Sequence, residues 1–201
     1  MPHALPAVPA AILADLHRRH GEPQRHYHDW SHITALLAHF KSLAGAFECP
    51  QAVELAILFH DAIYDPQAHD NEVQSAVLLR QVMAGQADDA VLGRAERMVL
   101  ATARHLIPEG LPADETADMA LFLDMDLAIL GAGAGQFDQY EAGVRREYAH
   151  VSDSAFAVGR AAVLERFIAR DALYFSAWGK ARFEAAARTN IATSLARLRG
   201  T

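Results

Sequence analysis

The stretch Leu58-Phe59-His60-Asp61-Ala62-Ile63-Tyr64-Asp65-Pro66 decides how the rest of the chain is interpreted. An apolar run over residues 55–59 leads directly into a histidine and an aspartate, which is typical of a buried helix face that ends at a polar pair. Burying His60 and Asp61 costs free energy unless another group pairs with them. Because neutral imidazole and carboxylate are both good ligands for divalent ions, the pair predicts part of a metal centre.

The composition is that of a globular protein with one domain. The chain has 201 residues, of which 52% are hydrophobic and 21% charged, so one domain over residues 1–201 can bury a substantial core. A formal net charge of -7 argues against binding to polymeric nucleic acid or to a membrane surface. The single cysteine, Cys49, excludes an intrachain disulfide and fits a reducing compartment. Without a signal-peptide pattern or a membrane-spanning run, we expect a cytoplasmic protein.

Hydrophobic residues recur at helical spacing along the whole chain, and no segment alternates as a half-buried strand does. Boundary signals include Gly21 after the first helix, Pro50 at the start of the third, and Asp65-Pro66 after it. The predicted helices cover residues 7–20, 30–46, 50–64, a segment from Asp70, 88–104, 115–130, 136–150, 153–173 and 177–199. The sequence therefore predicts an all-α fold, a single-domain helical bundle.

A second histidine can complete the metal centre from the helix that begins near residue 30. His32 lies beside an apolar stripe in the first turns of that helix, and His28 precedes it by four residues. We expect His32 to be the ligand, with His28 as a residue that could replace it or support it.

Two aspartates interrupt the apolar run over residues 122–130. Side chains two positions apart on a helix point in different directions, so Asp124 and Asp126 cannot both face solvent while the neighbouring leucines pack. At least one of them is expected to face a cationic group. One of these aspartates, together with His32 and the His60-Asp61 pair, could bind one divalent ion and leave coordination positions open.

The order His, His-Asp, Asp on an all-helical chain resembles the HD superfamily of metal-dependent phosphohydrolases. Several segments are similar, more closely, to a bacterial group of predicted HD phosphohydrolases: residues 27–33, 59–66, Asn71-Glu72, Ser75-Ala76, 124–131, Gly159-Arg160, Arg170 and Tyr174. The resemblance implies the ligands His32, His60, Asp61 and Asp126. Asp126 is preferred because Leu127 follows it, much as in the family's Asp-x-Leu setting, and Asp124 remains the alternative.

The resemblance implies hydrolysis of a phosphate ester of a small molecule, a nucleotide above all, by a metal-activated water. The ion could be Mn, Mg, Co, Ni, Fe or Zn, because histidine and carboxylate ligands accept all of them. Asp65 and Glu72 are candidates for acid–base catalysis, and His105 could bind the metal or support a ligand. Bidentate phosphate binding is the role expected of the following residues: Arg145, Arg146 and Arg160.

Three other functions remain open. A non-catalytic nucleotide-binding module would keep the fold and bind a phosphorylated ligand without turnover. A helical interaction protein would use its histidines as polar core groups and hold no metal. An oxygenase with two irons would need further histidine ligands, for which His28 and His105 are available. The oligomeric state is also open.

Overall fold

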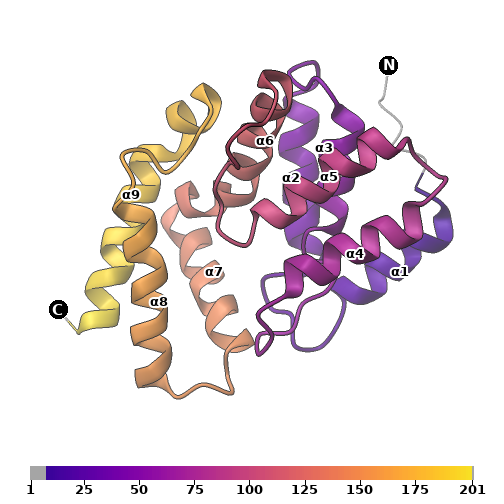
Figure 1. Cartoon of the computed structure of the whole chain (residues 1–201). Coiled ribbons are helices and arrows are strands. Elements are labelled where there is room, and N and C mark those ends of the chain that lie inside the picture. The colour runs from indigo at the N-terminus through magenta and orange to yellow at the C-terminus, as the bar shows by residue number, and fades with distance from the viewer. Residues whose placement is uncertain (1–7, 201) are drawn as a thin grey trace. The chain divides into compact units, whose positions relative to one another are not determined.

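The computed structural model describes residues 8–200 (Figure 1). All regular secondary structure in that range is helical, apart from one isolated bridge between Ala84 and Ala87, which confirms the predicted all-α class. The α-helices are α1 Ala10–His20, α2 Trp30–Ser42, α3 Pro50–Phe59, α4 Asn71–Met83, α5 Asp89–Ala101, α6 Ala113–Asp126, α7 Ala134–Glu147, α8 Asp153–Ile168 and α9 Ala177–Arg199, and the 3-10 helix η1 spans Leu127–Gly131.

The chain divides into two compact units, of which the first ends at Leu123 and the second begins at Asp124, inside α6. A single domain over the whole chain stays a prediction. None of the helices in the described range is both long and apolar enough to cross a bilayer. The predicted start of the first helix at residue 7 lies outside the described residues.

The third helix ends earlier than predicted, at Phe59 instead of Tyr64. The amides that would continue it are bound by side chains of the next helix: Ile63 N donates to Ser75 Oγ at 3.0 Å, and Asp65 N donates to Asn71 Oδ1 at 3.0 Å. These side chains replace the carbonyl partners of a continuing helix, so the chain turns at His60.

The eighth helix ends early for a similar reason, at Ile168 instead of residue 173. Leu173 N donates to the carboxylate of Glu184, at 3.0 Å from Oε2, and Arg188 binds the carbonyls of residues 168, 170 and 171. The sixth helix also differs, because its last predicted turn is η1. A side chain at Gly131 would collide with Phe183 of α9, so glycine allows η1 and α9 to pack closely.

The core of the first unit is built around α3, which packs against α2, α4 and α5, while α4 and α5 lie side by side (Figure 1). Every residue from Ala52 to Phe59 is buried, so α3 is covered on all sides rather than on one face, and Glu54 is the polar exception in this run. Its start is held by the buried carboxylate of Asp118, which accepts hydrogen bonds from Glu48 N at 2.9 Å and Cys49 N at 2.8 Å. This central position carries the end of α3, and with it His60, into the interior.

The second unit has a core of its own, in which α9 packs against α8 and η1 (Figure 1). Its buried apolar residues are Leu127, Ala128, Leu130, Phe137, Leu164, Leu173, Tyr174, Phe183, Ala187, Ile191 and Leu195. The start of α9 is held by Asp124, whose carboxylate accepts hydrogen bonds from Phe175 N and Ser176 N, each at 2.8 Å. Both units thus use a buried aspartate of α6 to bind backbone amides ahead of another helix.

Candidate metal centre

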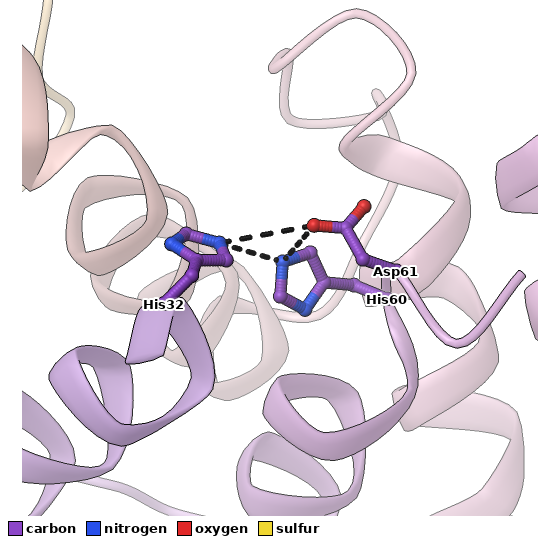
Figure 2. A group of neighbouring side chains, drawn as sticks. All are labelled: His32, His60 and Asp61. Carbon is purple, nitrogen blue, oxygen red and sulfur yellow. Dashed lines mark hydrogen bonds and ion pairs between the residues drawn. The ribbon is translucent and has the colours of Figure 1, made fainter. Parts of the chain in front are cut away.

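Three side chains of ligand type meet where α2 begins and α3 ends (Figure 2). His32 Nε2 lies 3.1 Å from His60 Nε2 and 3.8 Å from Asp61 Oδ2. His60 Nε2 lies 3.0 Å from Asp61 Oδ2. Both imidazole rings are buried, and the carboxylate is 18% exposed. These residues form a group that could hold a metal ion, as the sequence predicted for His32, His60 and Asp61.

Local structure brings the first histidine to this place. Asp29 caps α2, because its Oδ1 accepts hydrogen bonds from Ser31 N at 2.8 Å and from Ser31 Oγ at 2.5 Å. The helix then turns His32 inward beside Ile33, which is completely buried. A short, fixed helix start therefore defines where the imidazole of His32 lies.

The second histidine is oriented by the helix that it ends. His60 Nδ1 lies 3.0 Å from the carbonyl oxygen of Ile57, one turn back in α3. A carbonyl can only accept, so Nδ1 carries the hydrogen, and Nε2 of the neutral ring is an acceptor. That acceptor faces the acceptor oxygen of Asp61. Two acceptors in contact require a cation between them, either a proton on His60 or a metal ion.

The electrostatics of Asp61 reflect the same arrangement. Burial on its own would raise the pKa of this carboxyl, but the charge of His60 and its hydrogen bond, with smaller contributions from His28 and His32, hold the pKa of Asp61 well below its usual range. The carboxylate is therefore ionised, as a metal ligand must be.

Four further residues that the sequence singled out lie in the first unit, outside the group of three. His28 lies beside the group: its ring centroid is 6.1 Å from that of His32, and its ring stacks on Tyr64. Asp65 is exposed and accepts a hydrogen bond from Gln67 N at 2.9 Å, which shapes the turn after α3.

The other two are Glu72 and His105. Glu72 is half-buried in the first turn of α4. His105 follows α5 with a φ of 47°, the left-handed conformation that non-glycine residues rarely adopt. The catalytic or ligand roles of these four residues stay predictions.

Asp124, one of the two aspartates at the start of the second unit, has its hydrogen-bond partners within that unit. It accepts hydrogen bonds from two backbone amides and from the Ser176 hydroxyl, with Ser176 Oγ donating to Oδ2 at 2.6 Å. The expectation that at least one of the two aspartates faces a cationic group stays a prediction. Both of its oxygens already accept hydrogen bonds. Asp126 is half-buried at the end of α6, and its role as the fourth ligand stays a prediction.

The arginines predicted to bind phosphate have partners within the second unit. Arg160 is largely buried and donates to Glu141 and, at 2.7 Å, to Tyr140 Oη. Arg145 binds the Asp153 carboxylate at 2.7 Å and the carbonyls of Tyr148 and Val151. Arg145 and Arg160 thus each bind groups of the protein itself.

The third of these arginines, Arg146, is exposed and donates to the carbonyl of Ala142 at 3.3 Å. Phosphate binding by the three residues stays a prediction.

Sequence reasoning missed two residues near the centre. Arg25, in the loop before α2, is buried and donates to the Asp61 carbonyl at 2.6 Å. His20 is buried at the end of α1, where burial lowers its pKa to about 4, and its Nε2 has no hydrogen-bond partner within the described chain. The sequence does not predict that either residue is buried, because both lie in the polar segment of residues 17–29, whose composition is typical of a solvent-exposed surface.

The chain was also compared with known proteins. No protein-family model matches it, and no match was found among curated proteins or among solved structures.

Proposed function

We propose that this protein is a metal-dependent phosphohydrolase of the HD superfamily, and that His32, His60 and Asp61 hold its divalent ion. One observation carries the proposal. His60 Nδ1 is committed to the Ile57 carbonyl, so His60 Nε2 presents its lone pair to Asp61 Oδ2 at 3.0 Å, with His32 Nε2 at 3.1 Å. A cation bound by all three atoms removes the repulsion between them.

The donor set fits a catalytic ion. Two imidazole nitrogens and one carboxylate oxygen, with Asp126 as the predicted fourth ligand, leave coordination positions for water and substrate. The set is compatible with Mn, Mg, Co, Ni, Fe or Zn, so the proposal names a divalent ion and not an element. The hydrogen bond from His60 Nδ1 to Ile57 is the kind of support that metal-binding histidines have in other proteins.

The chemistry follows from what phosphoryl transfer needs, which is positioning and neutralisation of charge. When bound, a divalent ion polarises a phosphoryl oxygen and acidifies a water molecule. The imidazoles and Asp61 hold the site in one geometry. Glu72, half-buried at the start of α4, and Asp65 are proposed to take up and deliver protons.

Aromatic side chains beside the centre favour a nucleotide among phosphate esters. The Tyr27 ring centroid lies 4.9 Å from that of His32, and the His28 ring stacks on Tyr64 with centroids 4.4 Å apart. All three residues of this aromatic rim, Tyr27, His28 and Tyr64, are only half-buried. Planar rings of this kind can stack with a nucleobase. We therefore expect nucleoside phosphates to be better substrates than alkyl phosphates.

The proposal is tested by metal content and phosphate release measured together. Untagged wild-type protein is analysed by mass spectrometry after reconstitution with each candidate ion, beside His60→Ala and a control, His150→Ala. His150 is an exposed histidine that stacks on Tyr148 and is not among the proposed ligands, so its loss removes an imidazole from outside the ligand set. We expect about one equivalent of metal in the wild type and in the control, and none in His60→Ala.

Phosphate release is then measured over a panel of nucleotides and alkyl phosphates. Metal-dependent turnover should disappear in His60→Ala and persist in His150→Ala. Turnover retained in His60→Ala would contradict the proposal, and so would a wild type that takes up no metal. Metal and nucleotide binding without phosphate release would indicate the binding module, and about two equivalents of iron would indicate the oxygenase.

A further inference from the structure

We propose that Arg25 is a positioning residue that holds the two ligand-bearing segments of the metal centre in place. The inference rests on the proposed metal centre and adds a residue that lies outside its predicted ligand set. His32 comes from the start of α2, whereas His60 and Asp61 come from the end of α3. The distances between their ligand atoms therefore depend on how these two chain segments are joined.

The guanidinium of Arg25 connects the segment before α2 to the segment after α3 by hydrogen bonds. Its Nη1 donates to the carbonyl of His28 at 3.0 Å and to the carbonyl of Asp61 at 2.6 Å. Its Nη2 donates to the carbonyl of Ala62 at 3.3 Å. One planar group thus contacts the backbone four residues before His32 and the backbone of the ligand Asp61 itself.

The surroundings of Arg25 make this arrangement rigid. Its side chain is 0% exposed, its Nε donates to Glu22 at 3.2 Å, and its guanidinium lies over the Tyr64 ring. The carbonyls of Asp61 and Ala62 follow the end of α3, where backbone acceptors lack helical partners and a cation is favourable. Fixing the Asp61 carbonyl limits rotation of that peptide and so limits where the carboxylate can point.

A lysine cannot replace this function. An ammonium group is a compact donor on a flexible stem, whereas the guanidinium offers its hydrogens in a planar fork that reaches several acceptors at once. Arg25→Lys therefore keeps the charge and removes the geometry. Residues that orient metal ligands typically change metal affinity by about 10–100-fold when they are replaced.

The second unit contains a control that matches Arg25 in its hydrogen bonds, although the side chain of Arg188 is 36% exposed. Arg188 also donates from Nε to a glutamate, Glu184, at 2.8 Å. Its terminal nitrogens donate to three backbone carbonyls, at 3.2 Å for Ile168 and 2.9 Å for both Arg170 and Asp171. Arg188→Lys thus removes the same kind of hydrogen bonding around a helix end that carries no metal ligand.

The experiment is a titration of metal-free protein with Co²⁺, followed by its visible absorption, for wild type, Arg25→Lys, Arg188→Lys and Glu22→Gln. Thermal unfolding of the metal-free proteins is measured alongside. We expect both lysine variants to lose thermal stability. Only Arg25→Lys should bind Co²⁺ about 10–100-fold more weakly, with altered absorption bands. Glu22→Gln, a milder change on the Nε side of Arg25, should show a smaller loss of affinity and remain folded.

The possible failures are distinguishable. If the wild type binds no Co²⁺, the proposed metal centre is wrong and the inference falls with it. If the wild type binds Co²⁺ and Arg25→Lys has the same affinity and spectrum, the inference is wrong and the metal centre stands. Equal losses of affinity in Arg25→Lys and Arg188→Lys would show an effect of general destabilisation and would also overturn it. If Arg25→Lys does not fold, an unchanged affinity in Glu22→Gln contradicts the inference.

Discussion

Asp61 in the first unit and Asp124 in the second are both aspartates placed among apolar residues, yet their partners differ in kind. Asp124 accepts hydrogen bonds from two backbone amides and from the Ser176 hydroxyl. Asp61 faces the ring nitrogens of His60 at 3.0 Å and His32 at 3.8 Å. The first set consists of fixed donors, and the second consists of groups that are donors only when protonated.

This difference separates a structural carboxylate from a candidate ligand. Burial raises the pKa of Asp124, and the hydrogen bonds from Ser176 and Phe175 oppose that rise. Both carboxylate oxygens of Asp124 accept hydrogen bonds from groups of the protein. Burial would raise the pKa of Asp61 too, but the charge of His60 outweighs it. Asp61 is therefore stabilised only while a positive charge is beside it. Proton and metal ion are the two candidates for that charge.

Replacing each carboxylate by an amide should separate the two roles. Asp61→Asn removes an anionic ligand, and we expect at least about a 100-fold loss of metal affinity, beyond the range seen for residues that merely support ligands. In the metal-free wild type, a proton on His60 takes the place of the metal ion beside Asp61, so the metal-free variant should lose this ion pair and be less stable than the wild type. Co²⁺ titration and urea unfolding measure the two effects. Unchanged affinity would remove Asp61 from the centre.

Asp124→Asn should lower stability without changing metal affinity. An amide can offer only one oxygen, so its NH₂ group would face a backbone amide or the Ser176 hydroxyl. We expect a loss of about 2–3 kcal/mol of stability, with metal affinity unchanged. Urea unfolding at neutral pH measures the loss, and Asp153→Asn is the control because Asp153 is 95% exposed in its pair with Arg145 and should contribute less than about 1 kcal/mol. A loss of metal affinity in Asp124→Asn would break the distinction drawn between the two aspartates.

Glu54, another buried carboxyl, has neither kind of partner among the residues that the structure describes, and it extends the comparison. It is 7% exposed in the middle of α3, and burial alone raises its pKa to about 7. In an unfolded chain the group titrates near its usual value of 4.5. The folded state therefore holds its proton over a wider range, and stability falls as the pH rises from about 4.5 to about 7.

Glu54→Gln removes this pH dependence. We expect the variant to be more stable than the wild type by about 3 kcal/mol at pH 8, with little difference at pH 4.5. Urea unfolding across that range provides the measurement, with Glu109→Gln, an exposed glutamate, as the control. A destabilising effect at pH 8 would mean that ionised Glu54 has a favourable partner.

The helices and the candidate metal ligands can be predicted from the sequence, because both depend on which residue types lie close together along the chain. Helical spacing of apolar residues predicts the nine helical segments, and the last helix spans the predicted residues 177–199. An apolar run that ends in His60-Asp61 marks the end of α3 as a polar site in the interior. His32 could be added because its helix has a clear start and an apolar stripe, which together fix the face on which it lies.

The hydrogen-bond partners of the buried polar side chains could be read only from the tertiary structure. Asp124 contacts Ser176, which is 52 positions away, and Arg25 contacts Asp61, which is 36 positions away. Arg160, whose phosphate binding stays a prediction, is paired with Glu141 across 19 positions. Hydrogen bonds act over about 3 Å and depend on direction, so their partners are set by which segments pack together. Periodicity in one sequence predicts which residues are buried, and the packing of distant segments determines which of them meet.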